Sequence, residues 1–285
     1  MARNPSLKPP ATAGRALSEK LAVDTGAVLD AYEKSLEARG TGPTQLQLVR
    51  RLHSAVSGVP VGVLDANAAL SGSDSTKRRQ LGVLIAALNH AVKIKLIEPG
   101  ARPHIELPPT GQPREVYLGA IEEAQFWRDA VSGAPLSRVG RFVAVALDTG
   151  ARRQAIHDLT WDRVSFVTDT IDFRTPGQRV TKKRRVPVPI AKRLRPVLDQ
   201  AYYERKDNFV LGEGDFRTTW ETWRAQHPEW AHVTPHVLRH TFATLRAQKG
   251  VPMWELSGVL GDTIETTTRN YLHHNPDHLR SAVEL

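Results

Sequence analysis

The stretch Thr234-Pro-His-Val-Leu-Arg-His-Thr-Phe-Ala243 decides how the second half of this 285-residue chain folds. Its threonine is a natural helix N-cap, and the proline after it fits the first helical position, where a missing N–H costs nothing. A helix that begins there places His236, Arg239 and His240 on one face, because these residues are spaced by three and four positions. The pattern therefore predicts a buried helix that presents an imidazole and a guanidinium side by side.

About one further helix downstream, the segment Thr266-Thr-Thr-Arg-Asn-Tyr-Leu-His-His274 contains Tyr271. His236-Val-Leu-Arg239 resembles the His-x-x-Arg box of the tyrosine recombinases, the phage integrase family, and Asn270-Tyr271 stands where that family carries its nucleophile. A single His-x-x-Arg box occurs by chance in many chains. A tyrosine at this spacing, together with two more matches upstream, makes the joint signal specific, and the resemblance covers most of the chain.

The first upstream match follows the apolar run Phe142-Val-Ala-Val-Ala-Leu147, which predicts a central buried helix. The family's first arginine box reads Thr-Gly-x-Arg, and Thr149-Gly-Ala-Arg152 matches it. Two arginines after a helix end are commonly surface residues, but Arg152 follows a glycine turn and precedes an apolar helix, so its side chain is expected to turn inward. The family often has an acidic residue three positions later. That position is Ala155, so another group must hold Arg152.

The second upstream match lies on a predicted hairpin. Three short segments alternate like strands joined by turns, namely residues 164–167, 170–174 and 184–188. They predict a three-stranded antiparallel sheet with the basic run Thr181-Lys-Lys-Arg-Arg185 at its tip. Such a run is ordinarily a solvated charged turn, and only the surrounding motifs overturn that interpretation. The family carries its catalytic lysine here, usually directly after a threonine, so the resemblance favours Lys182. Lys183 is the alternative, because this hairpin is shorter than usual.

The composition favours a polyanionic partner. The chain carries 39 Lys and Arg against 30 Asp and Glu, a formal net charge of +9, and the basic excess is spread over both halves. Solubility alone could explain the charge, but a pI of ≈ 10.0 favours nucleic acid. The absence of cysteine excludes disulfides and thiolate chemistry. No apolar run approaches the roughly 20 residues that span a bilayer, and the first ten residues lack a signal-peptide core, so a cytoplasmic protein with no membrane partner is expected.

The chain as a whole predicts a mainly α-helical protein of two domains. Residues 1–20 are expected to be a flexible N-terminus. Residues 21–100 predict an all-α domain, which the resemblance identifies as the SAM-like helical core-binding domain that grips DNA. Residues 101–116, rich in proline and without a hydrophobic period, predict a linker. Residues 117–285 predict an α+β catalytic domain with the small antiparallel sheet.

The clearest helix of the first domain begins near residue 74 and has three cations in its first turn. Cations there oppose the helix dipole at a mild local cost. From the residues alone, a solvated charged turn and a phosphate contact both remain open. The family uses this domain to grip DNA, which favours contact. With the hairpin, the expected DNA-binding residues are Lys77, Arg78, Arg79, Lys183 and Arg184.

The resemblance implies that DNA is cut and rejoined through a covalent 3′-phosphotyrosine. Arg152 and Arg239 suit this chemistry because each offers a rigid, permanently charged fork of donors that can bracket the non-bridging phosphate oxygens. Tyr271 is the expected nucleophile. An ordinary tyrosine has a pKa of about 10, so His236 is expected to help take its proton at neutral pH. Lys182 is the expected acid for the departing 5′-oxygen. The chemistry requires no metal or other cofactor.

By the same resemblance, the protein acts as a homotetramer on two DNA duplexes and is a monomer when free. A type IB-like topoisomerase shares this chemistry but works as a monomer, and size and the two-domain layout favour the recombinase. A catalytically impaired DNA-binding relative is the other alternative. It is motivated by Ala155 and by Asp262, and opposed by the presence together of the two arginines, the histidine and the tyrosine.

Asp262 stands where many family members have a histidine or a tryptophan. An ionised carboxylate cannot donate a hydrogen bond to a phosphate. Three arrangements are open: the side chain turns towards Arg152 or another cation, it is protonated, or Thr263 supplies the donor. We favour the first, because a carboxylate that holds an arginine also makes up for the acidic residue missing at Ala155.

Overall fold

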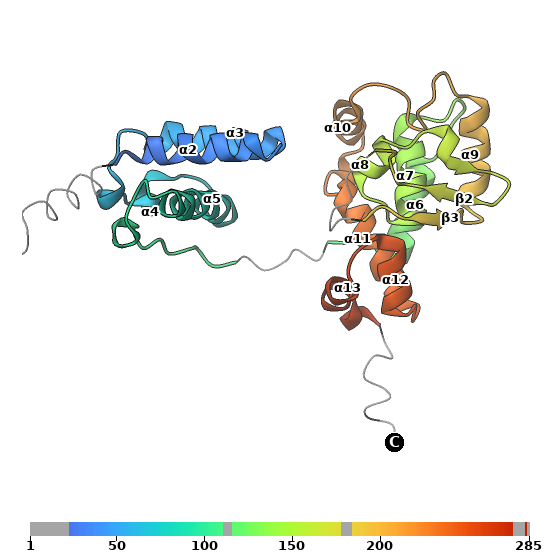
Figure 1. The fold of residues 1–285 in the computed structure, drawn as a ribbon. Helices are drawn as coiled ribbons and strands as arrows, with labels where there is room; N and C mark the ends of the chain where they lie inside the picture. The colour runs from blue at the N-terminus through green and yellow to red at the C-terminus, as the bar shows by residue number, and fades with distance from the viewer. Residues whose placement is uncertain (1–22, 111–115, 178–183, 276–282, 284–285) are drawn as a thin grey trace, which may run out of the picture. The chain divides into compact units, whose positions relative to one another are not determined.

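The computed structural model describes residues 23–110, 116–177, 184–275 and 283 (Figure 1). The expected flexible N-terminus, residues 1–20, lies outside these ranges. The chain divides into two compact units, one that ends at Pro113 and one that begins at Arg114. Within the described ranges, no helix combines the length and the apolar character needed to cross a membrane.

The first unit is built from helices, as its sequence predicts. Its elements are α2 (Thr25–Ala38), α3 (Pro43–Val56), η1 (Val61–Val63), α4 (Ala66–Ala69), α5 (Asp74–Lys93) and η2 (Pro99–Ala101). Helix α2 packs against both α3 and α5 (Figure 1). The core consists of fully buried valine and leucine side chains, among them Val28, Leu29, Val49, Leu52, Leu81, Leu84 and Leu88. Their spacing of three and four residues turns one stripe of each helix inward.

Part of the segment expected to be a linker packs on this first unit. The side chains of Ile105 and Leu107 lie against its core. Asn67 Nδ2 donates a hydrogen bond to the Glu106 carbonyl oxygen at 3.3 Å, and the Arg78 guanidinium donates to the Pro108 carbonyl oxygen. The chain therefore follows the helical unit beyond α5, because two apolar side chains in the proline-rich segment reach its core.

The second unit is built around α7 (Arg138–Thr149). Residues 142–147 of this helix are at most 1% exposed, so the apolar run does form a central buried helix. The helices that pack on α7 are α6 (Ala120–Ala130), α8 (Arg153–His157), α9 (Leu194–Tyr203), α10 (Phe216–Gln226) and α11 (Pro235–Gln248). Phe216 and Trp220 on α10 are buried in this core.

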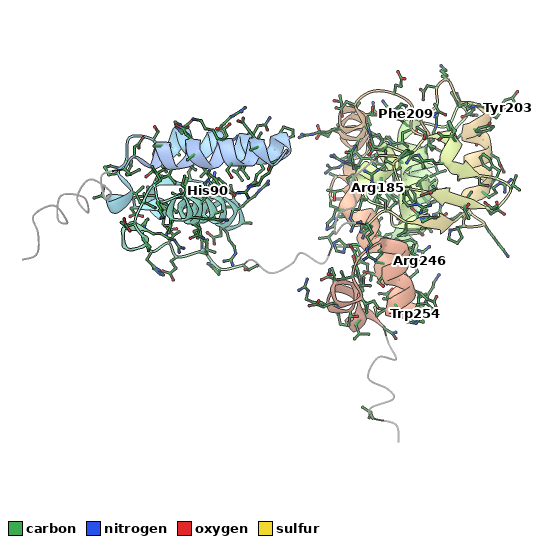
Figure 2. All side chains as sticks on the ribbon, in the orientation of Figure 1. His90, Arg185, Tyr203, Phe209, Arg246 and Trp254 are labelled. Atoms are coloured by element: carbon green, nitrogen blue, oxygen red, sulfur yellow. The ribbon has the colours of Figure 1, made fainter. Side chains whose placement is uncertain are left out.

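Two further helices pack on α11 in the described ranges. They are α12 (Met253–Leu260) and α13 (Ile264–Tyr271), followed by the 3₁₀ turn η5 (Leu272–His274). Both helices contact α11, and Leu256, Leu260 and Tyr271 share a small core with Phe242 of α11. The side chain of Trp254 on α12 stays at the surface (Figure 2). Helix α11 thus joins the central helix to the segment that carries Tyr271.

The three-stranded antiparallel sheet is present and has the order β1-β2-β3. Its strands are β1 (Val164–Ser165), β2 (Thr170–Asp172) and β3 (Pro187–Pro189). In the register, Ile171 pairs with Val164 on one side and with Val188 on the other. All three side chains are buried, so the sheet covers the core with one apolar row.

The third strand differs from its expected bounds of 184–188 and begins three residues later. The carbonyl oxygen of Arg184 accepts a hydrogen bond from the Arg152 guanidinium instead of a strand neighbour. Arg185 donates to the Asp158 carboxylate at 2.7 Å and to the Thr175 hydroxyl at 2.6 Å. These residues are held by partners outside the sheet, so strand pairing starts only at Pro187.

Candidate active site

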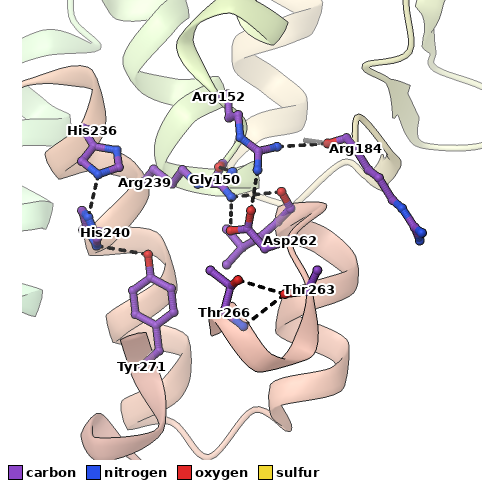
Figure 3. A network of polar contacts seen from close by, with 11 residues as sticks. Gly150, Arg152, Arg184, His236, Arg239, His240, Asp262, Thr263, Thr266 and Tyr271 are labelled. Carbon is purple, nitrogen blue, oxygen red and sulfur yellow. Dashed lines mark hydrogen bonds and ion pairs between the residues drawn. The ribbon is translucent and has the colours of Figure 1, made fainter. Parts of the chain in front are cut away.

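Asp262 binds two arginines at once (Figure 3). Its Oδ1 accepts a hydrogen bond from Arg152 Nη2, and its Oδ2 accepts one from Arg239 Nη2 at 2.5 Å. The Asp262 side chain is 19% exposed and that of Arg239 only 7%. Each carboxylate oxygen faces a different guanidinium group. The two arginines are therefore placed to bind two oxygens of one anion.

Arg239 on α11 also ties together the ends of two other helices. Its Nη1 donates to the Gly150 carbonyl oxygen at 2.7 Å, just after α7, and its Nη2 donates to the Leu260 carbonyl oxygen at 3.0 Å, at the end of α12. Carbonyl groups at helix ends have no partner within their own helix. Arg239 satisfies two of them, so its position is set by three elements and not by its own helix alone.

Two glycines allow the chain to turn at these helix ends. Gly150 and Gly261 both have a φ of 62°, a conformation that residues with a Cβ rarely adopt. A Cβ at Gly150 would lie 2.5 Å from the Phe242 ring, and one at Gly261 would collide with the Arg184 carbonyl oxygen. Arg152 follows the first turn and Asp262 the second, so both side chains enter the site from tight turns.

Arg152 is the N-cap residue of α8 and turns towards Asp262, as expected. Its Nη1 donates to the Arg184 carbonyl oxygen at 3.0 Å. Burial lowers the pKa of Arg152 from its ordinary value, the charge of Arg239 lowers it further, and Asp262 opposes both. The Asp262 carboxylate thus stabilises the charges of the two guanidinium groups, which lie close together and would otherwise repel each other. The prediction that Asp262 holds Arg152 in place of a residue at Ala155 is confirmed.

Tyr271 lies at the end of α13 with its hydroxyl directed at α11 (Figure 3). Its Oη lies 3.0 Å from His240 Nδ1, and His240 Nε2 lies 2.9 Å from His236 Nε2. Only 4% of Tyr271 is exposed. The tyrosine hydroxyl and two imidazoles therefore form a continuous line of hydrogen-bonding groups beside the arginine pair.

The environment favours the protonated form of Tyr271 and the neutral form of His236. Burial raises the pKa of Tyr271, the charge of Arg239 lowers it, and Asp262 raises it again. Burial likewise lowers the pKa of His236, and Arg239 lowers it further, whereas Asp262 raises it. A neutral imidazole can accept a proton and a protonated phenol must lose one before it can attack. The pair is thus in the states that proton transfer requires.

The structure brings together Arg152, His236, Arg239 and Tyr271 from three helices or their ends, with His236 and Arg239 both on α11. Lys182 and Lys183 lie outside the described residues, as does the rest of the run 178–183. The residues of the described ranges hold no cluster of three His, Asp or Glu side chains suited to a metal ion.

The other expected DNA-binding residues are placed as follows. Arg184 contributes its carbonyl oxygen to the site, while the residue itself is exposed. Lys77, Arg78 and Arg79 lie in the first two turns of α5, in the other unit, where Arg79 is exposed and Arg78 is bound to the Pro108 carbonyl oxygen. A cation whose guanidinium is already held by its own chain offers fewer donors to a phosphate, so Arg79 is the more available of the two.

His240 holds the contact with the tyrosine hydroxyl that was expected of His236. The helical period places both rings on one face of the helix, and the family's His-x-x-Arg box names only His236. The sequence feature that points to His240 is its spacing of four residues from His236, which puts the two rings beside each other on the helix. Their ring centroids lie 4.3 Å apart in an edge-on arrangement.

Residues 132–278 match the model of the phage integrase family. The integrase of Haemophilus phage HP1 is 32% identical over 183 residues, which cover 60% of this chain and 48% of that protein. The tyrosine recombinase XerA of Thermococcus kodakarensis is 26% identical over 277 residues, 90% of this chain and 94% of that protein. The chain thus spans about half the length of the phage protein and nearly all of the archaeal one.

Solved structures share the fold. The integrase of the transposon Tn1549, in complex with circular intermediate DNA, superposes with a TM-score of 0.72 at 19% identity and covers 90% of this chain and 99% of its own. A lambda integrase tetramer bound to a Holliday junction gives a TM-score of 0.69 at 16% identity, over 90% of this chain and 82% of that one. These likenesses confirm the expected combination of a helical unit with an α+β unit that carries a small sheet.

Proposed function

Because the chain belongs to the phage integrase family, we propose that it is a site-specific DNA recombinase that works through a covalent tyrosine intermediate. Tyr271 attacks a DNA phosphodiester, its Oη forms a bond to phosphorus, and the bond from phosphorus to the 5′-oxygen breaks. The product is a 3′-phosphotyrosine, and attack by another 5′-hydroxyl reverses the step on a new partner strand. The ester conserves the bond energy, so no cofactor or external energy source enters the reaction.

The observation that carries this proposal is the arginine pair beside the tyrosine. The Asp262 carboxylate accepts a hydrogen bond from Arg152 on one oxygen and from Arg239 on the other, which holds the two guanidinium groups close together, where they can bind the non-bridging oxygens of a phosphate. Charge builds up on those oxygens during attack, and a preorganised donor aimed at such charge is typically worth about 10²–10³ in rate. The Tyr271 hydroxyl lies close enough for the charges of Arg239 and Asp262 to affect its pKa.

The remaining roles follow from the same chemistry. His236 is proposed to help take the proton of Tyr271, because it is neutral and lies on the line of hydrogen bonds from the hydroxyl. The departing 5′-oxygen is a poor leaving group until it is protonated, and we assign that proton to Lys182. Lys183 is the alternative donor.

DNA binding is proposed to involve both units. Residues 21–100 act as a core-binding domain and residues 117–285 as the catalytic domain, with residues 101–116 between them. The proposed phosphate contacts are Lys77, Arg78, Arg79, Lys183 and Arg184. Such contacts give affinity that falls steeply with salt and carry no sequence information. The net charge of +9 supports this kind of binding.

The active assembly is proposed to be a homotetramer on two duplexes, formed from monomers in the cytoplasm. The lambda integrase of similar fold is known as a tetramer on a Holliday junction, which supports this assembly.

The decisive experiment is incubation with a nicked suicide duplex that carries the recombination site of the chain's own element. Cleavage next to the nick releases a short fragment, and loss of that fragment traps the covalent state. We expect a protein–DNA adduct that survives denaturation and disappears after proteolysis. A protein that binds this duplex but yields no adduct would be a DNA-binding relative without catalysis. Relaxation of plasmids that lack any such site would favour a topoisomerase instead.

Lys182→Ala is expected to cleave an ordinary phosphodiester slowly and to recover on a 5′-bridging phosphorothiolate, because sulfur leaves without a proton. General acid catalysis contributes about 10²–10⁴ in rate, so the loss on the ordinary substrate is expected in that range. Lys183→Ala is the matched control and is expected to be much milder. If the two variants exchange behaviour in single-turnover cleavage assays, the hairpin register is wrong by one residue.

Asp262→Ala is expected to slow adduct formation, because Arg152 and Arg239 lose the carboxylate that holds both of them. The loss should be smaller than deletion of a phosphate donor, about tenfold to 10²-fold. Asp262→His is expected to be no faster than the wild type. The rate of adduct formation and the melting temperature are measured for both variants. A histidine variant that cleaves markedly faster than the wild type would show instead that Asp262 is a weakened catalytic position.

A further inference from the structure

The residue in direct contact with the nucleophile is His240, not His236 (Figure 3). Tyr271 Oη and His240 Nδ1 are separated by 3.0 Å, an ordinary hydrogen-bond distance. His236 lies behind His240, with 2.9 Å between the two Nε2 atoms. Any proton that moves from the tyrosine towards the histidine pair therefore meets His240 first.

The hydrogen bonds indicate where the protons lie. Tyr271 is buried, and within the described ranges His240 is the one acceptor for its hydroxyl. A buried hydroxyl that donates to nothing costs about 1–3 kcal/mol, so the phenol is expected to donate to His240 Nδ1. A neutral His240 then carries its proton on Nε2 and donates to His236 Nε2. This arrangement satisfies both hydrogen bonds and leaves His240 Nδ1 ready to accept.

We propose that His240 is a further catalytic residue, the general base that removes the proton of Tyr271, and that His236 is a positioning residue that fixes the tautomer of His240. The proposal rests on the recombinase function proposed above. As Tyr271 Oη bonds to phosphorus, its proton moves to His240 Nδ1, the electrons of the breaking bond go to the 5′-oxygen, and Lys182 protonates that oxygen. In the reverse step His240 returns the proton to the tyrosine.

The charges around the pair suit this role. Arg239 lies next to His240 on α11, and Asp262 faces Arg239 from the turn between α12 and α13. Burial lowers the pKa of His236, and the charge of Arg239 lowers it further. When the phosphate gains negative charge during attack, a proton on His240 is balanced by that charge. The developing charge on the phosphate thus stabilises a protonated His240 during the reaction.

The variant His240→Asn tests whether His240 acts as a general base or only orients the tyrosine hydroxyl. The asparagine side-chain oxygen can occupy the place of Nδ1 and accept the same hydrogen bond, but it cannot take a proton at neutral pH. We expect this variant to bind DNA and melt like the wild type, and to form adduct about 10²-fold more slowly in single-turnover assays. His232→Asn, an exposed histidine before α11, is the matched control and is expected to react at the wild-type rate.

The second arm replaces Tyr271 by 3,5-difluorotyrosine, whose phenol is more acidic and needs a base less. In the His240→Asn background this replacement is expected to raise the rate of adduct formation by about tenfold or more, whereas in the wild type it changes the rate little. Because the comparison is made within one variant, a folding defect affects both measurements equally. The 5′-bridging phosphorothiolate should not rescue His240→Asn, since it relieves only the need for an acid.

An asparagine variant that keeps its rate within about threefold of the wild type would overturn the base assignment, and so would a slow variant that the fluorinated tyrosine fails to accelerate. Rescue by the phosphorothiolate would also overturn it, because His240 would then serve the leaving group. The proposed function is tested separately by the wild type: if it forms no adduct on the suicide duplex, the recombinase function fails, and this inference fails with it.

Discussion

Tyr271→Phe is expected to bind DNA with unchanged affinity and to form no covalent adduct with it. The substitution removes one oxygen from a side chain that is 4% exposed, so the packing with α11 is retained. The variant loses one hydrogen bond, to His240, at a cost of about 1 kcal/mol of folding stability. No other group at that position can form the phosphate ester. The measurement is adduct formation on the suicide duplex after denaturing electrophoresis, with binding followed in parallel.

Tyr117→Phe is the matched control for this prediction. Tyr117 belongs to the same unit and packs edge-on against His274, with ring centroids 5.3 Å apart. Its variant is expected to form adduct like the wild type, and mass spectrometry of the wild-type adduct should place the DNA on the peptide that contains Tyr271. Adduct at undiminished yield from Tyr271→Phe, or DNA attached to a different tyrosine, would disprove the assignment of the nucleophile.

Arg239→Lys is expected to lose both activity and stability, although it keeps the positive charge. The guanidinium donates to the Gly150 and Leu260 carbonyl oxygens and to Asp262, which lie on different segments. A lysine has its donors on a single nitrogen and cannot reproduce the planar fork that reaches all three. We expect adduct formation to fall by about 10²–10³ and the melting temperature to drop, because buried carbonyl groups lose their partner.

Arg246→Lys separates the effect of Arg239 from a general effect of arginine replacement on α11. The Arg246 guanidinium lies 4.0 Å from the centroid of the Phe242 ring, away from Asp262. A lysine there keeps the charge over the ring, so a near wild-type rate is expected. The assays are run well below both melting temperatures, so that unfolding does not contribute. If Arg239→Lys then cleaved as fast as Arg246→Lys, Arg239 would be structural and would not stabilise the transition state.

Helix α11, which carries the site, follows directly from the amino-acid sequence. Thr234 caps α11 as expected, since its hydroxyl accepts a hydrogen bond from the Val237 backbone N–H at 3.3 Å. Once that start is set, the helical period places His236 and Arg239 on one face of the helix without further information. The strands were less well determined. The third begins at Pro187 instead of Arg184, because the residues before it bind partners outside the sheet.

Which side chains of the site meet depends on how the helices pack. His236 and His240 share one face, so the period cannot tell which ring receives the tyrosine, and the packing of α13 on α11 brought Tyr271 to His240. For Asp262 the sequence left three arrangements open, and the two arginines that it binds lie 23 and 110 residues away along the chain. Contacts over such separations depend on how whole helices pack, and a pattern that repeats every three or four residues carries no information about that packing.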